Sequence, residues 1–171
     1  MIEPQPVTVT VTVTVNGARV HRFVEPRVSL ADFLRRDLGL TGTHLGCEVG
    51  ACGACIVNLD GQPVHACLML AVQVDGMRID TIEGLSDSGE LAELQAAFHA
   101  RNALQCGFCT PGILMVARDF LRDCRASGRR PTRAAIRDAL SGNYCRCTGY
   151  EAIVDAIESV AGAAPMREDA A

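Results

Sequence analysis

The chain carries one short segment rich in glycine and cysteine, Gly46-Cys47-Glu48-Val49-Gly50-Ala51-Cys52-Gly53-Ala54-Cys55. Its three thiols have the spacing C-x4-C-x2-C, and a fourth, Cys67, follows after eleven further residues. This is the plant-type [2Fe-2S] spacing, in which one loop supplies three thiolates and a more distant strand supplies the fourth. The segment therefore predicts an iron–sulfur cluster held by Cys47, Cys52, Cys55 and Cys67.

The small residues of this segment suit a loop that surrounds a cluster. Its three glycines and two alanines let the backbone wrap closely, with positive φ where needed, so that amide N–H groups can point at the sulfurs. A structural zinc site is the alternative interpretation. Zinc prefers two tight C-x2-4-C pairs, whereas here three thiols lie in a single open loop.

A second group of four cysteines consists of Cys106, Cys109, Cys145 and Cys147. Its spacing is C-x2-C, a gap of 35 residues, and C-x-C. Each pair comes directly before a predicted helix start, Thr110-Pro111 in one case and the capping box Thr148-x-x-Glu151 in the other. The positive end of a helix dipole favours bound negative charge, so we expect a second cluster here. A redox-active dithiol is the alternative, disfavoured because no βαβ pattern surrounds it.

The remaining composition limits what else the chain could be. The chain has 171 residues, nine of them Cys, and this length excludes a large multi-domain enzyme. Its net charge of -4 does not indicate nucleic-acid binding. Residues 1–6 lack the start of a signal peptide, and no apolar run approaches a membrane span. These features favour a cytoplasmic protein, in which clustered cysteines usually bind metal. The ninth cysteine, Cys124, continues an apolar helical face and is expected to be a buried core thiol.

The N-terminal half of the chain has the pattern of a β-sheet. Residues 7–15 alternate Val and Thr, so that Val falls on one face and Thr on the other, as a half-buried strand requires. Asn16-Gly17 follows directly and predicts a hairpin turn, and Asp60-Gly61 predicts a second one. The further strands expected from these patterns are residues 18–24, 56–59, 64–68 and 78–82.

Ser29 predicts the one helix of this half, over residues 30–38, because this N-cap serine is followed three residues later by Asp32. Several strands around one short helix make a small α+β domain, which we expect to span residues 1–83. Residues 82–88 have linker composition and are expected to mark the domain boundary.

Beyond residue 84 the apolar residues follow a helical period and define four faces. We expect a compact domain of four helices over residues 84–162, followed by a flexible tail at residues 163–171. The four faces are Leu91, Leu94 and Phe98; Ile113, Val116, Ala117 and Phe120; Ile136, Ala139 and Leu140; and Ile153, Ala156, Ile157 and Val160.

Three motifs together resemble a known family, the iron–sulfur subunits of the molybdenum hydroxylases, which include xanthine dehydrogenase, aldehyde oxidoreductase and aerobic carbon monoxide dehydrogenase. The resemblance covers residues 7–161. Family members commonly carry His where this chain has Val49, a loop position that is not a ligand. The motifs are the segment at residues 46–55, Gln105-Cys106-Gly107-Phe108-Cys109-Thr110-Pro111-Gly112, and Asn143-Tyr144-Cys145-Arg146-Cys147-Thr148-Gly149-Tyr150.

The resemblance implies an α+β chain, with an N-terminal β-grasp ferredoxin-like domain followed by an all-α four-helix bundle domain. It implies that Gln105 and Cys147 approach a molybdopterin cofactor held by a separate large subunit. Electrons would pass from that centre through the second cluster and then the first, to an FAD-binding medium subunit or another acceptor. The chain would thus be the electron-transfer subunit of an oxidoreductase, with no substrate chemistry of its own.

The residues themselves indicate no other chemistry. The chain has no dinucleotide-binding glycine motif, no P-loop and no candidate catalytic triad. His44 and His65 lie near the first cysteine loop and could order it by hydrogen bonds, although a plain structural role is the simpler interpretation. A free-standing two-cluster ferredoxin or redox sensor remains the alternative function.

Overall fold

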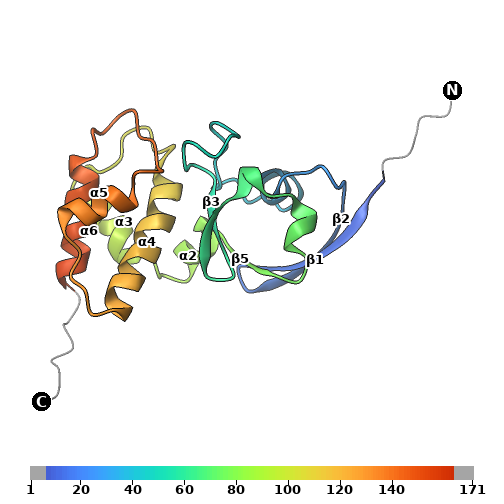
Figure 1. Ribbon diagram of the computed structural model, residues 1–171, viewed down its shortest axis with the longest axis horizontal. Helices are drawn as coiled ribbons and strands as arrows, with labels where there is room; N and C mark the ends of the chain where they lie inside the picture. The colour runs from blue at the N-terminus through green and yellow to red at the C-terminus, as the bar shows by residue number, and fades with distance from the viewer. Residues whose placement is uncertain (1–6, 164–171) are drawn as a thin grey trace, which may run out of the picture.

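The structure, a computed structural model, describes residues 7–163. Figure 1 shows a sheet at one end of the molecule and a group of helices at the other. The five strands have the order β2-β1-β5-β3-β4, in which β1 runs parallel to β5 and all other neighbours are antiparallel. The strands are β1 (Val9–Val15), β2 (Ala18–Val24), β3 (Ile56–Leu59), β4 (Gln62–His65) and β5 (Arg78–Asp80).

The hairpin of β1 and β2 follows the sequence pattern. Asn16 and Gly17 both have positive φ (50° and 80°), as a type I′ turn requires. The side chains of Val11, Val13 and Val15 are buried, whereas the threonines between them are partly exposed. The predicted alternation of faces is therefore confirmed in this strand.

The second hairpin turns at Asp60 and Gly61, again with positive φ (47° and 87°). Its second strand is shorter than predicted, because β4 ends at residue 65 and a 3₁₀ helix, Ala66–Leu68, follows. The prediction of a strand over residues 64–68 is therefore wrong beyond residue 65. The 3₁₀ turn has a clear consequence, since it brings the Cys67 side chain into contact with the thiol of Cys55.

The predicted helix after Ser29 is present but not uniform. α1 (Leu30–Asp32) is a short turn that continues as a π-helical segment, Phe33–Asp37. The Ser29 hydroxyl accepts a hydrogen bond from the amide of Asp32 (3.0 Å), as an N-cap should. This helical segment covers the sheet and completes its core with the fully buried side chains of Leu30, Ala31, Phe33 and Leu34.

Replacing Ser29 by alanine should destabilise the chain modestly, because the Asp32 amide loses its acceptor. Loss of an N-cap costs about 1 kcal/mol, which corresponds to a fall in Tm of about 2–4 °C for a chain of this size. Thermal unfolding followed by circular dichroism measures the shift. Ser141→Ala, at an exposed turn position, is the control. Equal Tm values for the two variants would show that the cap contributes nothing.

Five helices form the other end of the molecule. Four of them carry the four predicted apolar faces. The prediction of a linker over residues 82–88 is wrong for residues 82–87, which form α2. Its Leu85 is buried in the helical core, and this packing overrides the loop-like composition. The helices are α2 (Ile82–Asp87), α3 (Ala92–Ala100), α4 (Thr110–Ala126), α5 (Arg133–Ala139) and α6 (Glu151–Ala163).

Residues 7–163 form two apolar cores. The core of the sheet unit (residues 7–81) contains buried residues between 11 and 79, and that of the helical unit (residues 82–163) contains buried residues between 85 and 160 together with Ile56. α4 packs against β3 and β4 and so joins the two units. Between residues 7 and 163, no helix is both long and apolar enough to cross a bilayer. Ala163, where the predicted tail begins, is helical as the last described residue of α6, and the rest of the predicted tail, residues 164–171, lies outside the described residues.

Candidate metal centres

The first four cysteines lie in or next to one loop of the sheet unit. Cys47 and Cys52 lie in the loop, Cys55 directly precedes β3, and Cys67 lies in the 3₁₀ helix after β4. The loop turns back on itself through residues with positive φ, which are Glu48 (53°), Gly50 (74°) and Gly53 (70°).

Backbone N–H groups surround the sulfur of Cys47. The sulfur accepts hydrogen bonds from the amides of Ala51 (3.3 Å) and Cys52 (3.4 Å). Hydrogen bonds from backbone amides lower the pKa of the Cys47 thiol to about 6. The amide of Val49 has the largest effect, and that of Cys52 the next largest. A loop that stabilises a thiolate in this way suits a ligand of an anionic cluster, as the small residues of the loop predict.

Cys55 lies on the buried side of this group. Burial raises the pKa of its thiol to about 12, and the side chain of Cys67 is in hydrogen-bonding contact with it. Nδ1 of His65 lies 3.9 Å from the Cys55 sulfur. A metal ion that binds here must displace the proton of this thiol, so that metal binding is coupled to proton release.

The second four cysteines also meet in pairs. The sulfurs of Cys106 and Cys147 are 3.6 Å apart and exposed. Cys109 and Cys145 are in side-chain contact, and burial raises the pKa of Cys109 to about 12. Burial acts against ionisation of Cys145, but hydrogen bonds with Thr148, Cys147 and Cys109 together outweigh it and lower the pKa of its thiol.

The helix starts beside these cysteines differ in detail from the prediction. Cys109 itself, not Thr110, is the N-cap of α4, with Pro111 in the first turn. The predicted capping box of α6 is absent, because the Glu151 side chain turns to the arginines of α5. The Thr148 hydroxyl instead accepts from the amide of Tyr150 (3.2 Å) and contacts the Cys145 sulfur (3.1 Å).

The sulfurs of each group meet in pairs, an arrangement that suits the two irons of a [2Fe-2S] cluster. Within residues 7–163, no three Cys, His, Asp or Glu side chains converge where one metal ion would bind. Structural zinc needs four ligands around one ion, whereas a [2Fe-2S] cluster distributes its four thiolates over two irons. The contacts observed are Cys47 with Cys52, Cys55 with Cys67, Cys106 with Cys147, and Cys109 with Cys145. The donors therefore fit two [2Fe-2S] clusters.

A backbone junction connects the two cysteine groups. The carbonyl of Cys52 accepts a hydrogen bond from the amide of Tyr144 (2.9 Å), the residue next to Cys145. The neighbouring carbonyl of Gly53 accepts from the side chain of Asn143 (3.2 Å), which is buried. The sequence suggested two clusters but not this junction, because nothing in either motif shows that the loops touch.

Aromatic contacts strengthen the same junction. The ring of His44 stacks on Phe108, with ring centroids 4.7 Å apart, and His44 Nδ1 lies 2.7 Å from the Phe108 carbonyl oxygen. His44 therefore does order a cysteine loop, but it contacts the loop of the second group. The last residue of β4, His65, remains beside the first group.

The second group opens onto the surface. Gln105, Cys106 and Cys147 are exposed, and three large apolar residues lie around them, Leu104 (39% exposed), Phe108 (47%) and Tyr144 (61%). The first group has its own exposed apolar residues, Val49 (71%) and Leu68 (59%). Each group therefore has a rim of exposed apolar side chains of its own, which also includes one exposed charged residue, Glu48 at the first group and Arg146 at the second.

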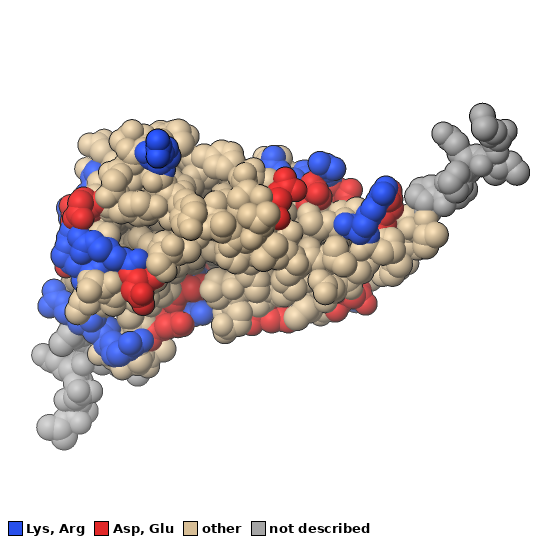
Figure 2. All heavy atoms as spheres, turned by 45° about the horizontal axis from the view of Figure 1, so that its top comes forward, with Lys and Arg blue, Asp and Glu red and all other residues tan. Residues whose placement is uncertain are grey.

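Charged residues gather over the helical unit, where Figure 2 shows basic side chains with acidic ones among them. Arg133 of α5 contacts three carboxylates of α6, with Asp155 the nearest at 2.6 Å. Arg137 adds a 2.7 Å contact with Glu151, which lowers the pKa of that carboxyl. These pairs fit a solvated helical surface.

The Glu151 contacts predict a specific pH dependence. Because Arg137 lowers the pKa of Glu151, its contribution to stability is complete above the ordinary carboxyl value of about 4.3 and is lost as the pH falls through the lower folded-state value. Glu151→Gln should therefore lower Tm by a constant amount from about pH 8 to about pH 5. The difference should shrink in about 1 M salt, because both partners are exposed.

The control for Glu151→Gln is Glu93→Gln, whose nearest arginine nitrogen is 3.8 Å away and which should change Tm less. A difference between wild type and Glu151→Gln that varies between pH 6 and pH 8 would contradict this account of the carboxyl.

Two protein families match the chain in sequence. Residues 13–81 match a 2Fe-2S iron–sulfur cluster binding domain, and residues 81–158 match a [2Fe-2S] binding domain. Each match contains one group of four cysteines.

Whole relatives match as well. The chain is 52% identical to the gamma subunit of caffeine dehydrogenase from Pseudomonas sp. (strain CBB1), over 85% of this chain and 87% of the relative. It is 51% identical to the small subunit of nicotine 6-hydroxylase from Paenarthrobacter nicotinovorans, over 86% and 87%. A chain of quinoline 2-oxidoreductase from Pseudomonas putida 86 superposes with a TM-score of 0.84 at 49% identity, covering 90% of this chain and 93% of that one. This chain belongs to the small iron–sulfur subunits of the molybdenum hydroxylases, which carry two [2Fe-2S] clusters.

Proposed function

We propose that this subunit links a molybdopterin-binding large subunit to an FAD-binding medium subunit or another electron acceptor. In this proposal, Cys106, Cys109, Cys145 and Cys147 hold the cluster next to the molybdopterin, and Cys47, Cys52, Cys55 and Cys67 hold the cluster next to the acceptor. When bound, each [2Fe-2S] cluster takes up and releases one electron at a time. The protein's part is to hold the two centres at a fixed separation and to present each to a partner.

The observation that carries this proposal is the junction between the two cysteine loops. The Cys52 carbonyl and the Tyr144 amide connect one loop directly to the other by a 2.9 Å hydrogen bond. Each loop has its own set of exposed apolar side chains at the surface, as expected of a chain with two docking partners. Gln105 and Cys147 lie exposed on the rim of the second group, which supports their proposed place beside the pterin.

The chain is divided into two domains in this proposal, and the complex is placed in the cytoplasm. We assign residues 1–83 to the ferredoxin-like domain and residues 84–162 to the helical domain, because the two apolar cores separate close to this point. We place the complex in the cytoplasm. All nine cysteines lie within the described residues and none of them is in a disulfide, which suits a reducing compartment.

Copurification with the partner subunits tests the proposal. The chain coexpressed with them should contain about four iron and four sulfide, and should bring down a subunit that contains molybdopterin. Tyr144→Arg should abolish capture of that subunit while both clusters remain, because a charge would be buried in the rim. Val49→Arg should keep the molybdopterin subunit and lose the acceptor.

Phe23→Arg is the matched control. Phe23 is 71% exposed on the edge strand β2 of the sheet unit, and its replacement should leave both partners bound. A chain that carries both clusters but binds no molybdopterin subunit would instead favour the free-standing ferredoxin.

A further inference from the structure

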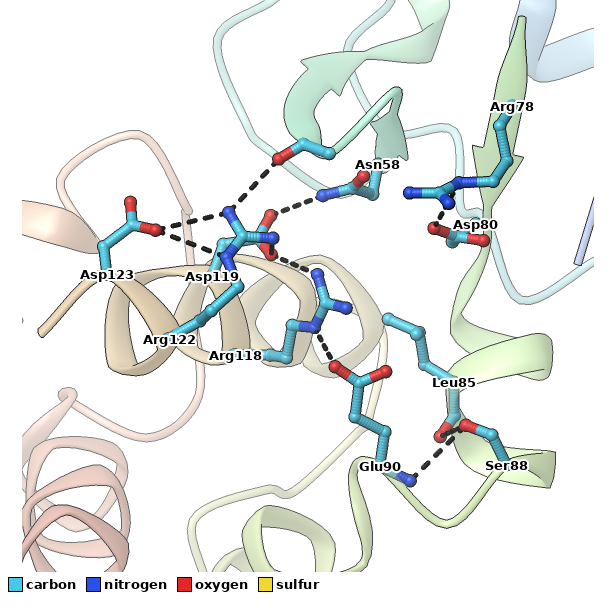
Figure 3. A network of polar contacts seen from close by, with 11 residues as sticks. Asn58, Arg78, Asp80, Leu85, Ser88, Glu90, Arg118, Asp119, Arg122 and Asp123 are labelled. Atoms are coloured by element: carbon cyan, nitrogen blue, oxygen red, sulfur yellow. Dashed lines mark hydrogen bonds and ion pairs between the residues drawn. The ribbon is translucent and has the colours of Figure 1, made fainter. Parts of the chain in front are cut away.

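A buried polar contact joins the sheet unit to the helical unit outside the two cysteine groups (Figure 3). Asn58 is the third residue of β3, and its amide nitrogen donates to the carboxylate of Asp119, on α4, at 2.8 Å. The two residues are 1% and 4% exposed. This contact therefore connects the two units in an environment from which water is excluded.

Arginines extend this contact to both sides. The second carboxylate oxygen of Asp119 accepts from Arg118 and lies 3.0 Å from Arg122. Arg122 also donates to the carbonyl of Gly61, in the turn between β3 and β4 (3.1 Å). Figure 3 shows that α4 is thus tied to the β3–β4 hairpin at two points.

The Asn58 side chain is expected to make its position in β3 less stable than an apolar side chain would. The other residues of β3 are all buried and apolar, and the side-chain oxygen of Asn58, Oδ1, is buried without a hydrogen-bond partner. An unpaired buried acceptor costs free energy that an apolar side chain would avoid. Asn58 instead fixes the position of α4 relative to β3, because its hydrogen bond with Asp119 forms only when α4 packs on β3 in one register.

That register bears on both cysteine groups. β3 begins directly after Cys55, and α4 begins directly after Cys109. A shift of α4 along β3 would therefore change the separation of the two groups and strain the Cys52–Tyr144 hydrogen bond. Electron tunnelling slows exponentially with separation, so a small shift has a large kinetic effect.

We propose that Asn58 and Asp119 are a positioning pair that sets the separation of the two centres and thereby the rate of electron transfer between them. This inference rests on the cysteine ligands assigned under the proposed function. It adds that residues outside the cysteine motifs determine the rate of electron transfer between the two centres.

The test compares the full chain, loaded with both clusters, in wild-type and Asn58→Leu form. Asn58→Leu should keep the iron content and both spectral signals, because no ligand changes. We expect a weaker magnetic interaction between the two reduced clusters and slower electron transfer between them. We also expect about tenfold faster amide exchange at Tyr144, whose N–H donates across the junction to the Cys52 carbonyl. A residue that served stability alone would leave the magnetic interaction unchanged.

Asp119→Leu is the second variant and decides the matter if Asn58→Leu does not fold, because leucine leaves the Asn58 amide without an acceptor. Arg125→Gln is the control on the same helix, since its ion pair with Glu93 lies within the helical unit. If either folded variant kept the wild-type magnetic interaction and amide exchange, the positioning pair would be overturned. Absence of a cluster from the wild-type chain would refute the ligand assignment instead, so that the two failures are distinguishable.

Discussion

Alanine at position 112 is expected to disrupt the contact between the two units, although it adds only one methyl group. Gly112 lies in the first turn of α4, where a Cβ atom would collide with the carbonyl oxygen of Gly53 and lie 3.3 Å from Cα of Ala54. These neighbours are backbone atoms and cannot rotate away. We expect a loss of about 2–3 kcal/mol and a fall in Tm of about 5–10 °C.

Gly142→Ala is a matched control for Gly112→Ala. Gly142 lies in the same junction, but a Cβ atom there would meet nothing within 4 Å. Its Tm should stay close to that of wild type. Thermal unfolding of both variants provides the measurement, and equal Tm values would show that α4 can move away from the loop at little cost.

The sequence predicted the features that depend on local chemistry. Asn16-Gly17 and Asp60-Gly61 need positive φ, so both hairpin turns could be located from the residues alone. The two groups of four cysteines were recognisable from spacing, and Cys124 is buried as its helical position suggested. In each case a single segment contains the whole signal.

The features that the sequence did not predict depend on partners far away in the chain. Gly53 and Gly112 approach one another from separate motifs, and neither motif shows the contact. α2 has the composition of a loop and is helical because Leu85 finds a core to pack against. The Thr148 capping box failed for the same reason, since Glu151 has arginine partners on another helix.

Asn58 is the clearest example of this limit. In the sequence it is the one polar residue of the four-residue strand Ile56–Leu59, where a polar residue is unfavourable. Its role follows only from Asp119, which is 61 residues away and lies on the helix that covers the strand. A polar residue in a buried strand is thus a useful signal that something specific lies opposite, although the sequence does not identify it.

The largest effect is expected from replacing single cysteine ligands. Under the proposed assignment, Cys52→Ser removes the cluster of the first group, and Cys109→Ser removes that of the second, because a hydroxyl is a poor substitute for a soft thiolate ligand of iron. Each variant should retain about two of its four iron atoms and one of the two paramagnetic signals. Iron analysis and low-temperature electron paramagnetic resonance of the reduced chain provide the measurements.

The two losses should be independent, even though the loops touch. The junction between them uses the backbone carbonyl of Cys52, which Cys52→Ser leaves in place, and the second group takes none of its thiols from the sheet unit. Cys124→Ser is the control and should keep both signals, because Cys124 lies outside both groups. Loss of both signals from either ligand variant would mean that each centre needs the other in order to form. In that case the junction would be a requirement for cluster assembly, and not only a connection between two centres that form separately.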